Sequence, residues 1–188
     1  MIVKQRPTEI AFTIIELLIV MAIIIILAGL VLGISGYAHE KGARSRAEAE
    51  IAAMSAALES YKADNGIYPV YTDTDTLNPT SDLDSDPNHP ASSKYAAASL
   101  YLYKELSGDT NADRKPKAKS YFSFPPTMLY PKGNPTNVSA IIDPFGFYFG
   151  YSTAKASSPS GSGGYNPTYD LWSTGGSTTD TAKWIKNW

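Results

Sequence analysis

The chain has 188 residues, which is enough for one domain and one special segment but not for two full cores. Its formal net charge is -2, from 16 Lys and Arg against 18 Asp and Glu, so bulk charge gives no support for nucleic acid as a partner. The chain has no cysteine, which excludes disulfides, zinc-thiolate sites, cysteine nucleophiles and cysteine lipidation.

The first predicted element is an apolar helix. From Leu17 to Ile34, eighteen residues pass without a polar side chain, and a helix of that length measures about 27 Å, close to the hydrocarbon thickness of a bilayer. Because lipid requires every backbone group to be hydrogen-bonded within the segment, we expect a helix and not a strand. The apolar core of a secretory signal peptide is shorter, about 7 to 15 residues. The segment is therefore predicted to cross a membrane once.

An amphipathic helix is predicted to follow without a break. Apolar residues at spacings of three and four form one stripe in this Ala-rich stretch, namely Ile51, Met54, Leu58 and Tyr61. Gly66 then supplies a helix stop. We expect one helix from Phe12 to Asp64, about 80 Å long. Its first half faces lipid or partner helices, and its second half packs on a globular domain.

A single carboxylate, Glu16, stands near the start of the apolar run. An ionised carboxylate at the centre of a membrane helix costs on the order of 2.5 to 3.5 kcal/mol, and less near the interface, so it usually has a partner. Two interpretations follow from its position. Glu16 either lies in the headgroup region, where water solvates it, or pairs with a cation.

The residues around this carboxylate carry a resemblance to a known family. The stretch AFTIIELLIV, residues 11–20, follows a short leader that contains Lys4 and Arg6. It resembles the processing signal of type IV pilins and of type II secretion pseudopilins, in which a membrane prepilin peptidase cuts before the Phe and methylates the new amine. The resemblance implies a cut between Ala11 and Phe12, with Glu16 as the fifth mature residue. The family usually has Gly where Ala11 stands.

Cleavage at this point would create a cation close to Glu16. The new α-amino group of Phe12 would lie one helical turn away, on the same face of the helix. In a filament, the amine of one subunit could meet Glu16 of another. Such a desolvated pair would specify the axial register of the subunits.

Later stretches resemble the major pseudopilin of type II secretion. They are LESYKADNGIYP (58–69), DPFGFYFGY (143–151), YDLWSTGG (169–176) and the ending WIKNW (184–188). The resemblance implies an α+β pilin fold, in which a long N-terminal helix packs on a small antiparallel sheet. Its parts would be a leader peptide (1–11), a transmembrane and assembly half-helix (12–36), an amphipathic half-helix (37–66) and an exported globular head (67–188).

The same resemblance implies a location and a set of partners. The chain would sit in the cytoplasmic (inner) membrane as a single-pass protein, with its head on the periplasmic side, until it enters a filament. Its partners would be further copies of itself, the prepilin peptidase, the inner-membrane assembly platform and the ATPase of that system.

The head is predicted to combine one helix with several strands. Residues 71–93 lack apolar periodicity and are expected to form a long loop. A helix is predicted from Ser92 or Ser93 to Ser107, with Gly108 as its stop. Its candidate buried positions are Tyr95, Leu100, Tyr103 and Leu106. Strands are predicted over 119–124, 138–142, 145–151 and 167–173, and a flexible connection over 152–164.

The predicted strand 145–151 has aromatic residues on one face, namely Phe145, Phe147, Phe149 and Tyr151. A small sheet needs an apolar face to lie on the long helix. We therefore interpret this aromatic face as core and not as a ligand site.

Calcium is the one cofactor that the resemblance suggests. Related major pseudopilins hold the ion in the C-terminal loop, which here keeps Ser173 and Asp180 as candidate ligands. This loop has few carboxylates, which favours weak binding. Two acidic runs, at 82–86 and 109–113, begin like calcium loops but lack the Gly and the final acid of an EF-hand. We interpret both as solvated loops, although the second could hold an ion.

The leading functional hypothesis is a structural subunit of a type II secretion pseudopilus or a type IV pilus-like filament, supporting protein secretion. The alternative is a minor pilin or a membrane-anchored binding module, whose head recognises a surface, a carbohydrate or an exported protein. A tethered hydrolase would need a clustered acid pair or a nucleophile with its base. The sequence shows neither, and its two histidines, His39 and His89, lie in no catalytic motif. We do not expect an enzyme.

Overall fold

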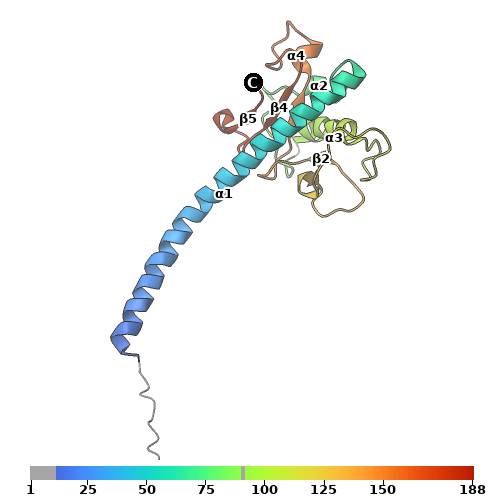
Figure 1. Cartoon of the computed structure of the whole chain (residues 1–188). Coiled ribbons are helices and arrows are strands. Elements are labelled where there is room, and N and C mark those ends of the chain that lie inside the picture. Colours follow the sequence, from blue (N-terminus) through green and yellow to red (C-terminus); the bar gives the residue numbers. More distant parts are fainter. Residues whose placement is uncertain (1–11, 90–91) are drawn as a thin grey trace, which may run out of the picture. The chain divides into compact units, whose positions relative to one another are not determined.

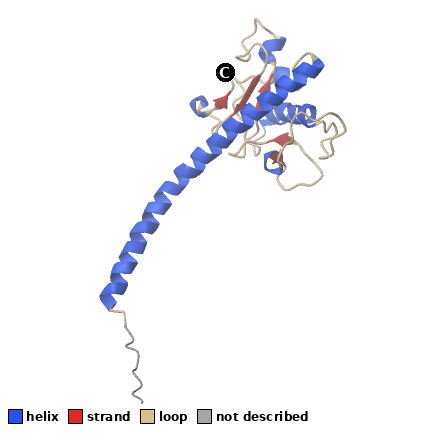
Figure 2. Ribbon diagram, viewed as in Figure 1, coloured by secondary structure: helices blue, strands red, loops and turns tan. Residues whose placement is uncertain are grey.

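The described chain combines one long helix with short helices and short strands. The computed structural model describes residues 12–89 and 92–188. Its helices are α1 (Ile14–Asn65), α2 (Thr72–Thr76), α3 (Ser93–Ser107) and α4 (Ala154–Ser157), with 3-10 helices η2 (Pro126–Met128) and η3 (Thr181–Lys183). Its strands are β1 (Leu129–Tyr130), β2 (Ala140–Ile141), β3 (Gly150–Ser152), β4 (Asp170–Ser173) and β5 (Ile185–Lys186). Figure 2 shows how short these strands are beside the loops that join them. The predictions of an α+β class and of a long N-terminal helix are confirmed.

The chain divides into two compact units, Met1–Lys41 and Gly42–Trp188. We refer to them as the N-terminal unit and the C-terminal unit. Helix α1 begins in the first unit and ends in the second. It ends at Asn65, directly before Gly66, whose φ of 81° and hydrogen bond from its N–H to the Lys62 carbonyl close the last turn as predicted.

The apolar stripe of α1 forms one side of the core of the C-terminal unit. Met54 and Leu58 are fully buried, Ile51 is almost so, and Tyr61 packs partly against the same cluster. The prediction of this stripe is confirmed. The other side of the cluster comes from α3, β3 and β4, through Leu102, Leu106, Phe149, Tyr151 and Leu171. Figure 1 shows this part of α1, in cyan and green, lying across the elements of the C-terminal unit.

Helix α3 is confirmed from its start to its stop. It begins at Ser93 and ends before Gly108, which has a φ of 72° and donates its N–H to the Lys104 carbonyl. Three of the four predicted core positions are buried, namely Tyr95, Tyr103 and Leu106, and Leu100 is half-buried against the core.

The strands form two small antiparallel sheets. One pairs β1 with β2, and the other has the order β3-β4-β5. In the second sheet Gly150 lies opposite Trp172, and a Cβ on Gly150 would overlap the Trp172 ring. Trp172 is fully buried in a second cluster, where its ring stacks on Trp184 and its Nε1 donates to the Tyr95 hydroxyl at 3.2 Å. The Trp172 ring can therefore pack in this position only because residue 150 has no side chain.

The prediction of a strand over 119–124 is wrong. This segment has no regular structure, and the backbone N–H groups of Tyr121 and Phe122 both donate to the Leu106 carbonyl, at 2.7 and 2.9 Å. The last carbonyls of a helix have no donor within the helix. The segment satisfies one of them at the end of α3 and does not pair with a strand.

The predicted strand 145–151 is largely a turn. Only its last two residues enter β3, because the Asp143 carboxylate accepts hydrogen bonds from the N–H groups of Phe145 and Phe147, both at 2.9 Å, and turns the chain. Phe149 and Tyr151 are buried in the core as predicted, and Phe145 packs partly on it. Tyr148, on the opposite face, is buried as well, so this segment has two buried faces. The strands predicted over 138–142 and 167–173 are present but shorter, as β2 and β4.

Two segments that we expected to be loops each contain a short helix. Helix α2 lies within 71–93 and α4 lies within 152–164. The two segments contact each other: the Thr74 and Thr153 hydroxyls are 2.6 Å apart, and the Thr153 N–H donates to the Thr74 carbonyl. These polar contacts join residues far apart in the sequence. Because polar contacts and not an apolar face hold these two helices, the sequence has no apolar periodicity from which either could be predicted.

We expect Gly150→Ala to destabilise the C-terminal unit by about 3 kcal/mol, because the new methyl group overpacks the Trp172 ring. Thermal unfolding of the full chain in detergent, followed by tryptophan fluorescence, measures the loss. Gly42→Ala is the matched control, since a Cβ there meets nothing within 4 Å on helix α1. Equal unfolding temperatures for the two variants would contradict the packing described.

Candidate functional site

The start of α1 is closed by a reciprocal pair of side chains. Glu16 Oε2 accepts hydrogen bonds from the Thr13 N–H at 2.9 Å and from the Thr13 hydroxyl at 2.8 Å. In return, the Glu16 N–H donates to Thr13 Oγ1 at 3.3 Å. This is a capping box, which satisfies backbone donors that have no partner in the first turn of a helix. It also explains why the helix begins at Ile14 and not at Phe12.

Sequence reasoning singled out Glu16 but missed Thr13. The spacing Thr-x-x-Glu immediately before an apolar run is the signature of a capping box, so residues 13–16 carried the signal. The structure shows a third role for the Glu16 carboxylate, besides the two that we expected. Glu16 stabilises the start of its own helix through one oxygen, while its Oε1 makes no hydrogen bond to any residue of 12–89 or 92–188.

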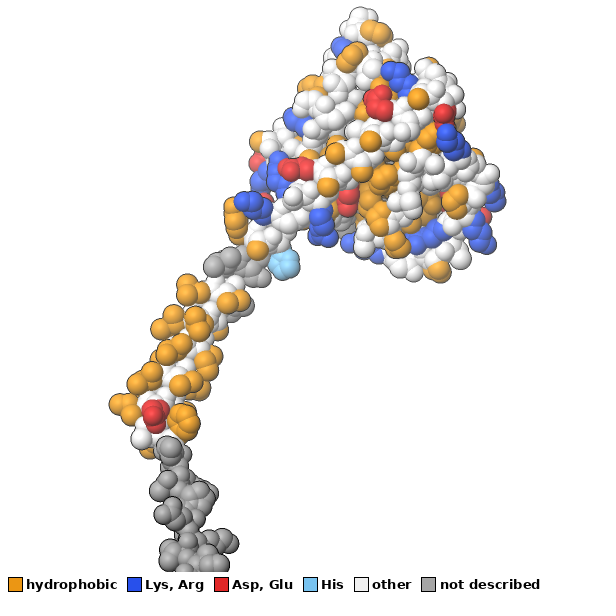
Figure 3. Space-filling model, in the orientation of Figure 1, with side chains coloured by type: hydrophobic (Ala, Val, Ile, Leu, Met, Phe, Trp, Pro, Cys, Tyr) orange, Lys and Arg blue, Asp and Glu red, His pale blue; other side chains and the backbone are white. Residues whose placement is uncertain are grey.

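The side chains that follow Glu16 form an exposed apolar surface. Every described side chain from Phe12 to Val31 is exposed, including Ile14 at 86% and Val31 at 67%. Figure 3 shows this stretch as a nearly continuous run of hydrophobic side chains. Its most apolar window of 18 residues has a mean hydropathy of 3.3, and α1 is the one helix in the described ranges that is long and apolar enough to cross a membrane. Surface of this kind requires lipid or other apolar helices around it.

Of the two residues that flank the predicted cleavage point, the structure describes one. Phe12 is described and exposed, directly before the capping box. Ala11 and the predicted leader 1–11 lie outside the described residues.

The two candidate calcium ligands each have a structural role. Ser173 is fully buried in β4; its hydroxyl donates to Asp143 Oδ2 at 2.5 Å and accepts from the Gly175 N–H. Asp180 is exposed, and its Oδ1 accepts from the Ala182 N–H at the start of η3. The structure thus joins Ser173 to Asp143 and shows no hydrogen bond from Ser173 to Asp180. Within the described ranges, no group of three or more His, Cys, Asp or Glu side chains is placed to hold a metal ion. Calcium at this loop stays a prediction.

The two acidic runs differ from each other. In the first, Asp82 pairs with Lys94 and Asp84 pairs with His89, while Asp86 caps a turn at Asn88. In the second, the expectation of a solvated loop is wrong for Asp109, which is fully buried. Its carboxylate accepts hydrogen bonds from the Tyr103 hydroxyl and from two backbone N–H groups, which offset the cost of burial.

A pair of acids inside the C-terminal unit was not expected. Asp143, after β2, is only 3% exposed, and burial raises its pKa. Glu50, on α1, is half-buried, and its Oε2 accepts no hydrogen bond from any described residue. Burial first, and then the charge of Asp143, raise the pKa of Glu50 to about 7, against the opposing charge of Arg46. Glu50 lies four residues before the buried Met54, so its place beside the apolar stripe could have been read from the sequence.

Comparison of the chain with protein-family models, with curated proteins and with solved structures gives no match in any of the three. The function proposed below therefore depends on the residues and contacts of this chain.

We expect the stability of the C-terminal unit to fall as pH rises from about 4.5 to 7. Glu50 binds its proton more tightly in the folded chain, with a pKa of about 7, than at the ordinary value of 4.5. Its contribution is therefore complete below the unfolded pKa and is lost as pH rises through the folded pKa. The full shift corresponds to about 3 kcal/mol, which solvent screening of a half-exposed group reduces to about 1 to 2 kcal/mol.

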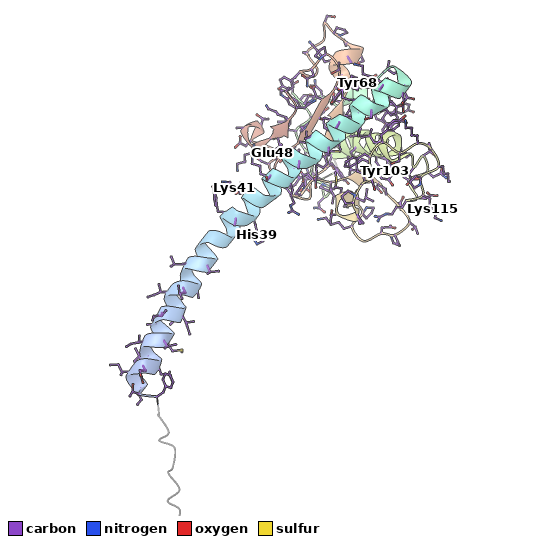
Figure 4. All side chains as sticks on the ribbon, viewed as in Figure 1. His39, Lys41, Glu48, Tyr68, Tyr103 and Lys115 are labelled. Carbon is purple, nitrogen blue, oxygen red and sulfur yellow. The ribbon has the colours of Figure 1, made fainter. Side chains whose placement is uncertain are left out.

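Thermal unfolding of the full chain in detergent at pH 5 and pH 8 tests this expectation. Glu50→Gln should remove most of the pH dependence and unfold at a higher temperature than the natural chain at pH 8. Glu48→Gln is the control, because Glu48 is an exposed carboxylate on the same helix (Figure 4). A natural chain that is equally stable at both pH values would refute the role of Glu50.

Proposed function

We propose that the chain is a structural subunit of a type II secretion pseudopilus or a type IV pilus-like filament, and that its work is polymerisation through α1. The observation that carries the proposal is the exposed apolar surface of the N-terminal unit, with a single carboxylate in its first turn. Lipid satisfies this surface while the chain waits in a membrane. Helices of neighbouring subunits would satisfy it in a filament.

The N-terminal unit has features that suit close packing of helices. Gly29 and Gly33 stand four residues apart on α1, and a Cβ at either position would meet nothing within 4 Å. Small residues at this spacing let two helix backbones approach closely in an apolar environment. The same surface therefore serves both a membrane-inserted and an assembled subunit.

Glu16 supplies the polar element of the proposed assembly. Its Oε2 is occupied by Thr13 in its own chain, while Oε1 is open to a donor from outside. The resemblance of residues 11–20 to prepilin signals suggests the donor, namely the α-amine that cleavage would create on Phe12 of a neighbouring subunit. An ion pair that is desolvated in this way fixes the register of packed helices, because breaking it leaves an uncompensated charge.

The proposal includes a location and machinery. The chain would wait in the cytoplasmic membrane with its C-terminal unit on the extracytoplasmic side, be cut by a prepilin peptidase, and be extruded by an inner-membrane platform driven by an ATPase. The charges near its start fit a segment that lies at a membrane surface, since Lys4 and Arg6 precede the apolar run and Lys41 and Arg44 follow it.

We expect the mature protein to begin at Phe12 and to carry one added methyl group. The chain is expressed in a cell that supplies a prepilin peptidase, and the intact mass of the membrane-extracted protein is measured. Ala11→Arg is the control, because a large charged side chain beside the cut should block cleavage. An uncleaved natural chain in that cell would contradict the processing step.

Two variants separate the capping role of Glu16 from its assembly role. Glu16→Gln keeps an oxygen acceptor for the capping box but removes the charge, and Thr13→Ala weakens the capping box by about 1 kcal/mol but keeps the charge. We expect Glu16→Gln to be cleaved and membrane-inserted yet to form no filaments, while Thr13→Ala still forms them. Electron microscopy of sheared filaments measures the outcome. Normal filaments of Glu16→Gln would refute the pairing, and a loss restricted to Thr13→Ala would reduce Glu16 to a helix cap.

A further inference from the structure

The guanidinium group of Arg114 has an unused edge inside the C-terminal unit. Its Nε and Nη2 atoms are shielded from solvent and donate no hydrogen bond to any residue that the structure describes. These two nitrogens form the edge of a guanidinium that binds a carboxylate through two parallel hydrogen bonds. Because shielded donors without an acceptor destabilise the folded chain, these two nitrogens need an explanation.

The loop after α3 holds this side chain in place. The buried Asp109 carboxylate accepts hydrogen bonds from the Arg114 N–H at 2.7 Å, the Tyr103 hydroxyl at 2.8 Å and the Asp113 N–H at 3.2 Å. Ala112 and Arg114 have φ values of 55° and 63°, a left-handed conformation that is costly for residues other than glycine. The surrounding hydrogen bonds maintain this strained backbone and thereby fix the position from which the Arg114 side chain extends.

A cavity of about 240 Å³ adjoins Arg114. Its wall combines the hydroxyl groups of Ser107 and Ser123 with apolar surface from Phe122, Phe124 and Leu129. Tyr103, which also lines it, is labelled in Figure 4 together with Lys115 of the following loop. A cavity of this size holds a group no larger than an amino-acid residue, and its lining suits a ligand that is apolar except at one end.

The charges around the cavity narrow the chemistry of that end. Among the residues that line the cavity Arg114 is the one cation, and no acidic residue lines it. One guanidinium balances the single charge of a carboxylate and offers it two parallel donors, whereas a dianion such as phosphate would keep an uncompensated charge. Ser123, on the same wall, adds a neutral donor.

We propose that this cavity binds one carboxylate that carries an apolar group, with Arg114 Nε and Nη2 as its two principal donors. The ligand class includes a free organic acid and the C-terminal carboxylate of a polypeptide. The segment 115–125, which forms much of the wall and has no regular secondary structure, moves to admit the ligand to the shielded edge.

Isothermal titration calorimetry of the full chain in detergent tests the proposal, with N-acetyl-leucine as the probe and N-acetyl-leucinamide as the uncharged comparison. We expect the acid to bind at least about tenfold more tightly than the amide, and Arg114→Lys to weaken the acid by at least about tenfold, because lysine cannot form two parallel hydrogen bonds. Lys115→Gln is the matched control. It removes a neighbouring cation that does not line the cavity, and it should leave binding unchanged.

Two further measurements keep the test independent of how well Arg114→Lys folds. Ser123→Trp places a large side chain at an exposed position of the cavity wall, outside the loop at 109–114, and it should abolish binding. In a spectrum of arginine side-chain amides labelled with ¹⁵N, one Nε–Hε signal should shift on addition of the acid, and Arg114→Lys should lack that signal.

The outcomes are distinct. No binding of the acid, equal binding of the amide, or tighter binding of inorganic phosphate would overturn the proposal, as would full binding by Ser123→Trp. A tetrapeptide ending in leucine separates the two sources of the ligand. If it binds more tightly than N-acetyl-leucine, and its amidated form does not bind, the cavity takes a polypeptide C-terminus; if it binds more weakly, the cavity takes a free acid.

Discussion

Burial of one apolar stripe on α1 is the interaction on which the C-terminal unit depends. Met54 and Leu58 are fully shielded from water by side chains of α3 and of the three-stranded sheet. The strands are two to four residues long, which is too short for a stable isolated sheet. Helices α1 and α3 together therefore supply the apolar surface on which these strands pair.

Buried carboxylates accept hydrogen bonds from backbone N–H groups that longer strands would pair within a sheet. Asp143 and Asp109 each accept hydrogen bonds from backbone N–H groups of the residues that follow them, and each closes a turn. A buried charge is tolerated when it is hydrogen-bonded in this way. By contrast, Glu50 Oε2 and the Nε and Nη2 atoms of Arg114 are shielded from solvent and have no hydrogen-bond partner among the described residues. For this reason we associate Glu50 with pH dependence and Arg114 with an outside ligand.

In the N-terminal unit the apolar side chains are exposed and surround the helix, whereas in the C-terminal unit they are buried. A helix of this kind finds its packing outside the chain, in lipid or in other helices. Its start is closed by Thr13 and Glu16, so no partner is required for the helix to begin. Capping uses one oxygen of Glu16 and leaves the other open, so a role in capping and a role in assembly are compatible.

Local patterns in the sequence determined the two longest helices, and the tertiary structure decided the sheets. The spacings of three and four predicted α1 and α3 with their stops, because helix hydrogen bonds join residues four apart. The aromatic residues in 119–124 suggested a strand, but the Leu106 carbonyl at the end of α3 accepts hydrogen bonds from the backbone N–H groups of Tyr121 and Phe122. Similarly, the Asp143 carboxylate turns the chain where a strand was expected to start.

The candidate sites divide in the same way. Glu16 and its capping partner lie three residues apart, so the box was readable from Thr-x-x-Glu. The charge of Asp143 acts on Glu50 only after distant segments have folded together. The same is true of the cavity beside Arg114, which Phe122 and Leu129 also line. Strands β1 and β5 are two residues long and carry too little pattern to be predicted. Contacts between neighbours in sequence are encoded locally, whereas the burial that shifts a pKa or isolates a guanidinium exists only in the folded chain.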